Sequence, residues 1–392
     1  MALRTDRPCR SAFSAVTVAP IGTMCPPGHV QHKRAMEILY AEGWQSWAPP
    51  TREGDGHGLL VVAEEHGVRA YIGDTELTAP DLESVLVAVG NRLSPGTLRR
   101  VPPGWCSWSQ YFSHVTAADV VENVDAAVEL ELPIEIVQVD DGWERGIGDW
   151  LEVSPRFGSL ADVVGRIRGA GMRPGIWVAP FLVGDRSELA AAHPEWVVGG
   201  ADAGRNWRQS LGVLDVSKAA DHLAHVFRTL HEWGFDYFKL DFLFAGALPG
   251  VEHYQEGMRI IREAVGPEAI LLGCGAPIFP SIGLVDAMRI GPDVLPEHPG
   301  EKPDLGYVIR STAARAWMNG RLWINDPDTL VARAEIVERE AWAAHLEHYG
   351  GVAFSSDRLA ALDERGLELT RSVLGSPQVR QTGTGATGLA PR

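Results

Sequence analysis

Several short apolar runs in this sequence end directly in charged side chains. The run that closes at Val139 is followed by two adjacent carboxylates, Asp140 and Asp141, and then by Gly142-Trp143. Adjacent acids repel each other unless something compensates, so we expect this pair to accept hydrogen bonds from two neighbouring hydroxyl groups, with Trp143 closing over an apolar ring face. The alternative is that Asp140 caps a loop and Trp143 lies in the core, because Asp-Gly is common in turns.

Two later runs combine a cation with a carboxylate. Lys239 and Asp241 lie two residues apart, and the alternation of a strand sends both to one face, which in a barrel strand is the interior. Arg289 and Asp293 repeat the combination at another predicted strand end. A buried ion pair is costly unless it has a use. The alternatives are a purely structural pair at Lys239 and a turn role for Asp293 after Gly-Pro.

Glycoside hydrolysis requires two carboxylates that flank a sugar. Its transition state resembles an oxocarbenium ion, so one ionised carboxylate stabilises or attacks it while a second, protonated one donates to the leaving oxygen. Asp241 and Asp293 can take these places if their strands are next but one around a barrel. The acids of Asn325-Asp326-Pro327-Asp328 are left open between a functional role and capping of a helix that starts near Leu330.

Tryptophan is unusually frequent, with 13 residues against 11 Phe and 7 Tyr. Indole faces can stack on the C–H surfaces of sugars. A single Trp is more often part of a core than a ligand platform, but five that fall in or at the ends of predicted strands favour a sugar site. These are Trp105, Trp108, Trp143, Trp177 and Trp323.

Eight apolar runs alternate with segments of helical period, which predicts an α/β fold with a (β/α)8 TIM barrel. The predicted strands are 104–108, 134–139, 174–179, 237–240, 270–274, 287–290, 322–324 and 352–354. The predicted helices include 117–130, 160–169, 219–233, 253–265 and 331–349. Ser217 is the expected N-cap of the third helix, and Gly234 lies just past its end. Such barrels carry their chemistry at the C-terminal ends of the strands.

The chain divides into three parts. Residues 1–103 are rich in Pro and Gly and predict an abbreviated N-terminal β region with short strands at 58–63 and 68–72. Residues 104–357 form the catalytic barrel. We expect a C-terminal helix and a disordered tail over 358–392, since the last residues are rich in Gly, Thr and Pro without periodicity.

At the charged strand ends the sequence resembles the melibiase-type α-galactosidases of glycoside hydrolase family 36. The resemblance covers about residues 104 to 357, and one further motif falls in the N-terminal region. The matching motifs are Gly104-Trp105-Cys106-Ser107-Trp108, Asp140-Asp141-Gly142-Trp143, Lys239-Leu240-Asp241, Gly273-Cys274-Gly275, Arg289-Ile290-Gly291-Pro292-Asp293, Trp323-Ile324-Asn325-Asp326-Pro327-Asp328 and, ahead of the barrel, Gly43-Trp44-Gln45-Ser46-Trp47. Family members usually carry a larger N-terminal β-sandwich and a C-terminal β domain.

The resemblance implies a retaining double displacement with Asp241 as the nucleophile and Asp293 as the acid/base. The other implied binding residues are Asp140 and Asp141 for the galactose 4-OH and 6-OH, Lys239 and Arg289 for further hydroxyls, Cys274 and Gly275 near the 2-OH, and Trp177, Trp108, Trp143 and Trp44 (or Trp47) around the pocket.

The assignment of one acid as nucleophile and the other as acid/base sets requirements on their separation and on their pKa values. Retention requires carboxyl groups about 5 to 5.5 Å apart, against roughly 6.5 to 9.5 Å for inversion. We expect Lys239 to lower the pKa of Asp241, and Asp293 to lie in a drier setting.

The net charge restricts the partners. With 51 acidic and 35 basic residues the formal charge is −16, which repels nucleic acid and anionic membranes but leaves a small neutral oligosaccharide unaffected. No apolar run approaches the roughly 18 residues of a membrane span. Four cysteines without a CxxC pair favour a reducing cytoplasm. No cofactor is expected, and the choice between monomer and homo-oligomer is left open.

Three other functions would use the same acids or the same pocket. An α-N-acetylgalactosaminidase or a galactosyl transferase would have the same machinery, and an inactive carbohydrate-binding barrel would keep the pocket alone. A metal-dependent hydrolase would need ligands such as the pairs His222/His225 and His345/His348. Both pairs lie on predicted helices away from the strand ends and lack a third ligand, so surface or packing roles are favoured.

Overall fold

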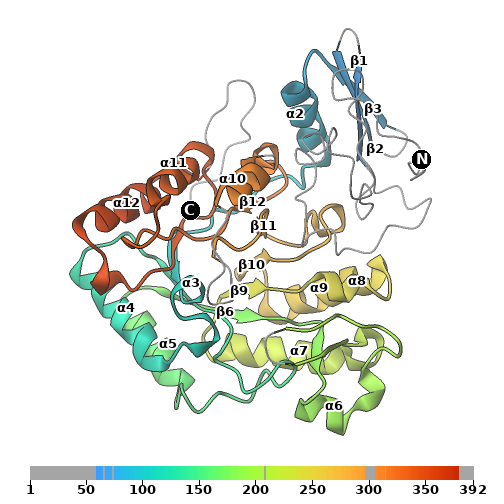
Figure 1. Cartoon of the computed structure of the whole chain (residues 1–392). Helices are drawn as coiled ribbons and strands as arrows, with labels where there is room; N and C mark the ends of the chain where they lie inside the picture. Colours follow the sequence, from blue (N-terminus) through green and yellow to red (C-terminus); the bar gives the residue numbers. More distant parts are fainter. Residues whose placement is uncertain are drawn as a thin grey trace.

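The computed structural model describes residues 59–64, 67–72, 75–206, 209–295, 305–313 and 315–378. Its centre is a sheet of eight strands in the order β12-β11-β10-β9-β6-β5-β4-β13, in which every ladder is parallel. The strands are β4 (Gly104–Cys106), β5 (Ile136–Val139), β6 (Arg173–Val178), β9 (Tyr237–Leu240), β10 (Ile270–Gly273), β11 (Ala287–Arg289), β12 (Ile324–Asp326) and β13 (Phe354–Ser355). All eight lie at the predicted runs, so the predicted α/β barrel architecture is confirmed (Figure 1).

The sheet curls until its two outer strands, β12 and β13, approach each other. They are joined by isolated bonds instead of a ladder. The Val352 N–H donates to the Asn325 carbonyl at 2.7 Å. The Leu330 N–H donates to the carbonyl of Phe354 in β13, also at 2.7 Å. We call this junction the seam. Among the described strands of the barrel it is the one junction between neighbours that has no ladder.

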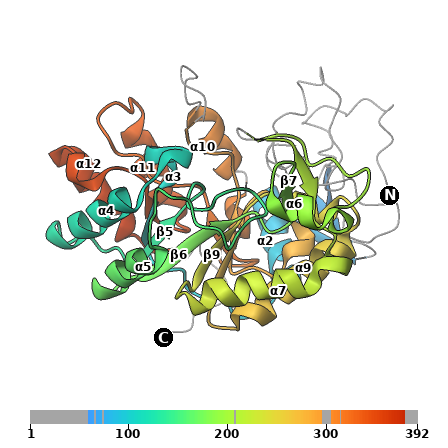
Figure 2. The same ribbon diagram turned by 90° about the horizontal axis from the view of Figure 1, so that it is seen from below.

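Helices cover the outside of the sheet (Figures 1 and 2). They are α4 (Ala117–Glu129), α5 (Leu160–Gly169), α7 (Val216–Glu232), α9 (Val251–Val265), α10 (Leu305–Ala313), α11 (Arg339–Tyr349) and α12 (Glu364–Leu374). In α7 the buried residues Leu223, Val226, Phe227 and Leu230 recur at helical spacing and form one apolar stripe. Helices α7 and α9 lie side by side.

Two helix starts differ from the sequence prediction. Asp215, not Ser217, is the N-cap of α7, because its carboxylate accepts the Ser217 N–H at 3.1 Å. The helix predicted over 331–349 begins only at Arg339. The Ala332 N–H and the Arg333 guanidinium both bind Asp357 instead, which holds this segment against the barrel in a non-helical path. No helix starts near Leu330, so the capping alternative for the acids of the Asn325-to-Asp328 segment does not apply.

The N-terminal region contains a helix that the sequence patterns did not predict. An antiparallel sheet of β1 (Leu59–Glu64), β2 (Gly67–Ile72) and β3 (Thr75–Ala79) precedes α2 (Leu82–Leu93). Asp81 caps α2 by accepting the Ser84 N–H at 2.7 Å. The helix packs beside the 3-10 turn Ala316–Met318 of the barrel. The Gly43-to-Trp47 motif and the predicted tail after residue 378 lie outside the described residues.

A second unpredicted feature interrupts the barrel after β6. The short strands β7 (Leu182–Gly184) and β8 (Leu211–Val213) pair antiparallel, and α6 (Glu188–Ala192) lies between them in the chain. Two further short helices, α3 (Trp108–Tyr111) and α8 (Phe244–Ala247), follow β4 and β9 directly. No helix in the described part of the chain is long and apolar enough to cross a membrane.

The barrel interior changes from apolar to polar along the strands. One buried layer contains Ile136, Tyr237, Ala287 and Ile324. Two residues further along the same four strands, on the same face, lie the buried side chains of Gln138, Lys239, Arg289 and Asp326. The polar layer therefore lies toward the C-terminal ends of the strands, where barrel enzymes place their chemistry.

The histidines on α11 include one with a packing role. His345 is buried, stacks on Trp342 and shares a hydrogen bond of 2.7 Å with the Thr312 hydroxyl. Burial lowers the pKa of His345 to about 4, and His348 contributes. The folded protein thus binds this proton more weakly than the unfolded chain, in which the pKa is near 6.5.

This shift predicts acid sensitivity. The stabilisation is complete above pH 6.5 and is lost as the pH falls toward 4, so His345 should account for a fall of about 2 kcal/mol in the free energy of unfolding between pH 7 and pH 5. Urea unfolding of the wild type and of His345→Gln at both pH values checks it. The same fall in both proteins would contradict the prediction.

Candidate active site

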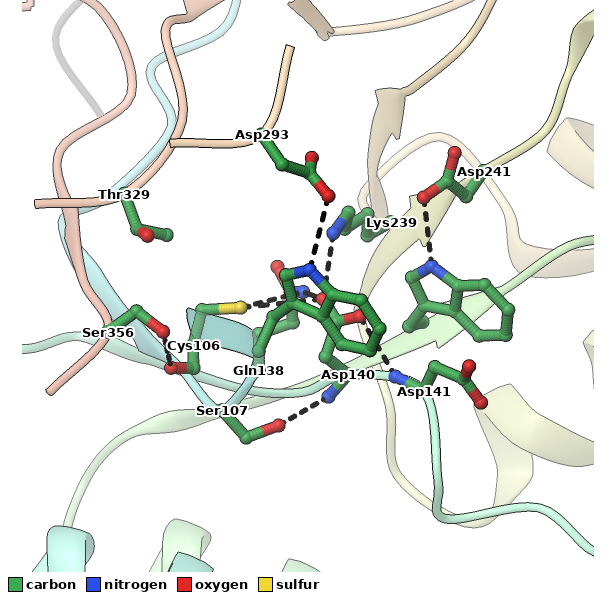
Figure 3. A network of polar contacts seen from close by, with 12 residues as sticks. Cys106, Ser107, Gln138, Asp140, Asp141, Lys239, Asp241, Asp293, Thr329 and Ser356 are labelled. Atoms are coloured by element: carbon green, nitrogen blue, oxygen red, sulfur yellow. Dashed lines mark hydrogen bonds and ion pairs between the residues drawn. The ribbon is translucent and has the colours of Figure 1, made fainter. Parts of the chain in front are cut away.

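Lys239 and Asp140 form a buried ion pair inside the barrel. The Lys239 Nζ donates to Asp140 Oδ2 at 2.8 Å, and the Gln138 amide donates to the same oxygen at 2.6 Å (Figure 3). Burial opposes the charge on Lys239, but the attraction of Asp140, with smaller contributions from Cys106 and Asp241, holds the pKa of Lys239 well above its usual range. We expected Lys239 to act on Asp241. Its direct partner is Asp140, from a different strand.

Asp140 is held by further donors. The Cys106 thiol lies 3.4 Å from Oδ2, and burial together with Asp140 raises the pKa of this thiol, so it stays a donor. Oδ1 accepts the Asp141 N–H at 2.9 Å. Both acids of the pair are buried and present almost no accessible surface to a sugar. Their predicted hydroxyl-binding roles stay predictions.

The chain turns sharply after the acid pair, and Gly142 makes the turn. Its φ is +117°, a conformation that favours glycine, and a Cβ there would meet the Ser113 carbonyl oxygen at 2.6 Å. The backbone thus holds the acid pair close to the loop after β4.

Arg289 is surrounded by three carboxylates. Its Nη1 donates to Asp293 at 2.7 Å, its Nε to Asp326 at 3.1 Å and its Nη2 to Asp328 at 2.8 Å. Burial opposes the charge on Arg289, but Asp328 and Asp326 outweigh it and hold its pKa above the usual range. The question left open for the Asn325-to-Asp328 acids is answered in part: Asp326 and Asp328 are partners of the buried arginine.

Asp241 follows β9 and is partly exposed. Its Oδ2 accepts the Trp177 indole N–H at 3.1 Å, and its Oδ1 accepts the N–H of Phe242 at 2.6 Å. Phe242 has a φ of +51°, which is strained for a non-glycine residue. The carboxylate is therefore fixed by two donors and a strained turn.

Asp293 follows β11 and is the most exposed of the site acids, with 40% of its side chain accessible. Its Oδ2 accepts the Trp108 indole N–H at 3.2 Å, and its Oδ1 accepts from Arg289. Figure 3 shows Asp241 and Asp293 on either side of Lys239. The drier setting that we expected for Asp293 is not found, because its carboxylate faces solvent and pairs with a cation.

Trp143, Trp177 and Trp108 were expected to line a sugar pocket, but their rings are buried. Trp143 is fully buried and donates its indole N–H to the Trp177 carbonyl at 2.8 Å, so the expected ring face for a sugar is not exposed. Trp177 and Trp108 are also buried, and they serve as hydrogen-bond donors to the two acids. A count of tryptophans could not indicate this role, since it depends on where each N–H points. Trp44 lies outside the described residues.

The predicted 2-OH loop follows β10. Cys274 is buried, its N–H donates to the Leu240 carbonyl at 2.7 Å, and burial raises the pKa of its thiol. The Gly275 carbonyl accepts the Phe244 N–H at 2.7 Å, and its φ is +58°. This loop is thereby tied to the residues just after Asp241. In the part of the chain that the structure describes, no three His, Cys, Asp or Glu side chains are grouped as a metal site would need.

Comparison with known proteins agrees with this arrangement. Residues 100–245 match the family model described as melibiase. The structure is similar to TtGalA, an α-galactosidase from Thermus thermophilus in complex with p-nitrophenyl α-D-galactopyranoside, with 33% sequence identity and a TM-score of 0.70 over 82% of this chain and 74% of that chain. TtGalA in complex with stachyose gives a TM-score of 0.71 over 83% of this chain and 79% of that chain.

Other relatives match over shorter stretches. The bifunctional α-galactosidase/sucrose kinase AgaSK of Mediterraneibacter gnavus is 32% identical over 100 residues, which are 24% of this chain and 10% of that protein. An α-galactosidase of Escherichia coli is 30% identical over 142 residues, which are 33% of this chain and 20% of that protein. The matched stretches thus span a fifth or less of these two relatives.

A parallel barrel with carboxylates at the ends of alternate strands has the two acids that a glycosidase needs. The similarity to TtGalA extends this conclusion from the fold to the family. The chain belongs to the melibiase family of α-galactosidase glycoside hydrolases.

The buried Lys239–Asp140 pair yields a stability prediction. Lys239→Met leaves the Asp140 carboxylate buried without its cation, so the free energy of unfolding should fall by about 3 to 5 kcal/mol in a urea titration. Adding Asp140→Asn should recover part of the loss, since it removes the unpaired charge.

The matched control is the Arg100–Glu135 pair, which has the same 2.8 Å separation but is half exposed. Arg100→Met should cost less than about 1 kcal/mol. Equal losses in Lys239→Met and Arg100→Met would contradict the interpretation.

Proposed function

We propose that this protein hydrolyses terminal α-D-galactosyl residues from small neutral α-galactosides, with retention of the anomeric configuration. The observation that carries the proposal is the contrast between the site acids. Asp140, Asp141, Asp326 and Asp328 are buried, whereas Asp241 and Asp293 are accessible and each is held by an indole N–H. Support comes from the family and from TtGalA, which was solved with p-nitrophenyl α-D-galactopyranoside and with stachyose.

In the first step Asp241 acts as the nucleophile. One oxygen of its carboxylate attacks the anomeric carbon as the bond to the leaving oxygen breaks, and protonated Asp293 gives its proton to that oxygen. The product is a galactosyl ester of Asp241. The donors on Asp241 fix the direction of the attacking oxygen before the sugar arrives.

In the second step Asp293 acts as the base. Its carboxylate takes a proton from water, the water oxygen attacks the anomeric carbon, and the ester bond to Asp241 breaks, so two inversions give net retention. A bound sugar would cover the exposed face of Asp293 and supply the drier setting that proton donation needs. Contacts of Lys239, Arg289 and Cys274 with sugar hydroxyls, which the family resemblance implies, are part of the same proposal.

The proposal is tested on a panel of p-nitrophenyl α-glycosides. The wild type should cleave the α-galactoside best and release α-galactose first, as seen by NMR. Asp241→Asn should abolish turnover, and Asp293→Asn should lower kcat/KM for an oligosaccharide by roughly 10²- to 10⁴-fold.

Other outcomes point to the alternatives. A β-anomer as first product would refute Asp241 as nucleophile. Preference for the N-acetylgalactosaminide, transfer to a sugar acceptor, or binding without turnover by the intact protein would support the other functions that share this pocket.

The indole donor to the nucleophile gives a separate prediction. Trp177→Phe keeps an aromatic ring but removes the N–H that binds Asp241, and a hydrogen bond to a charged group is worth about 1.5 to 3 kcal/mol, so kcat/KM should fall about tenfold or more. The control is Trp105→Phe, whose equally buried N–H donates to the main-chain carbonyl of Asp357. Equal losses in the two variants would argue against a role through Asp241.

A further inference from the structure

Asp328 has a place in the fold that neither a turn nor a helix cap explains. It follows β12 in the chain, its side chain is only 2% exposed, and it caps no helix. One of its oxygens accepts from Arg289 Nη2 at 2.8 Å, and the other accepts the N–H of Val294 at 2.6 Å. Both partners lie on β11 or on the loop that follows it.

These two contacts enclose Asp293. Val294 is the next residue after Asp293 in the chain, and Arg289 binds the Asp293 carboxylate through Nη1 at 2.7 Å. Asp328, Arg289, Asp293 and Val294 are therefore connected in a closed ring. Three of its links are charge-assisted hydrogen bonds, and the fourth is the chain itself between Asp293 and Val294. Charge-assisted bonds are shorter and stronger than neutral ones.

Arg289 itself has little freedom within this ring. Its Nε donates to Asp326, whose other oxygen accepts the Asp328 N–H at 3.0 Å. The planar guanidinium thus meets a carboxylate on each of its three nitrogens. Since its side chain is also buried, it presents Nη1 to Asp293 in one orientation.

The fold accepts two costs at Asp328. Its φ is +87°, which is strained for a residue other than glycine. Its carboxylate is also buried, and burial raises its pKa to about 6 against the opposing effect of Arg289. An unfavourable conformation of this kind is kept only where several surrounding contacts hold the residue in place. At Asp328 those contacts are with Arg289, which binds Asp293, and with Val294, which follows Asp293 in the chain.

We propose that Asp328 is a positioning residue that holds the proposed acid/base Asp293 in place, through Arg289 on one side and the Val294 backbone on the other. It does not touch the sugar. The inference rests on the proposed function, because it concerns the proton transfer assigned to Asp293.

The chain contains a close match to Asp328 that lacks this connection. Asp357 is fully buried, accepts from Arg333 at 2.7 Å and accepts the Ala332 N–H at 2.6 Å, so it has the same two kinds of partner. Arg333 also donates to two main-chain carbonyls, those of Ser109 and Ser356. Asp357→Asn therefore imitates the structural cost of Asp328→Asn but removes no bond to Arg289 or to the Val294 N–H.

The test compares two leaving groups. A p-nitrophenolate departs without a proton, whereas the leaving sugar of stachyose needs one, and kcat/KM reports the steps up to cleavage. In Asp328→Asn the amide NH2 must face either Arg289 or Val294, so one bond is lost. We expect kcat/KM to fall at least about tenfold more for stachyose than for p-nitrophenyl α-galactoside.

A second readout addresses the other half of the reaction. Azide can attack the galactosyl ester without a base, so it should accelerate turnover of the p-nitrophenyl substrate by Asp328→Asn and not by Asp357→Asn. Should Asp328→Asn fail to fold, Asp328→Ser, with a smaller side chain for the same space, is compared in the same way.

The outcomes separate this inference from the proposed function. A wild type that cleaves neither substrate would refute the proposed function and this inference together. A wild type that cleaves both, with Asp328→Asn losing equally on the two substrates and showing no azide response, would overturn the inference alone and leave Asp328 a structural residue like Asp357.

Discussion

The structure depends on two positive charges, Lys239 and Arg289, enclosed within the barrel. An uncompensated charge inside a protein costs several kcal/mol, so the fold has to bring carboxylates to both. Lys239 pairs with Asp140, which follows a strand two places away in the sheet. Arg289 pairs with Asp293 after β11, with Asp326 at the end of β12 and with Asp328 after it. The order of the strands is thereby coupled to the pairing of the charges. A strand displaced by one residue would leave a cation without its acid and turn polar side chains toward the helices.

Stability and chemistry share the same contacts at this end of the barrel. The buried acids neutralise the cations, while Asp241 and Asp293 stay accessible and are aimed by indole N–H groups. Of the four described non-glycine residues with positive φ, Phe242 and Asp328 adjoin or bind site residues, and Phe112 packs against Trp108. Strain concentrated around a few side chains is typical of sites whose geometry is fixed before a ligand binds.

The sequence predicted the barrel because its strands are short, buried on both faces and separated by amphipathic helices, and such patterns are local. Alternation likewise placed Lys239 in the interior. It could not identify Asp140 as its partner, since that pairing depends on strand order in space, nor could it show that Trp143, Trp177 and Trp108 donate N–H groups from buried positions. The late start of α11 could not be predicted because a distant partner, Asp357, decides it, whereas α2 has a local cap at Asp81 that was overlooked in the sequence.

The seam has a consequence for how the protein would lose activity. Asp328 lies in the stretch between β12 and Leu330, where isolated bonds, not a ladder, complete the barrel wall. Regions with few backbone bonds are where proteins open locally at the lowest free energy. Local opening there would release the Arg289–Asp293 unit while the remaining strands stayed paired. Inactivation by heat or denaturant would then precede collapse of the fold, and a ligand bridging the mouth would protect the barrel at its least secure point.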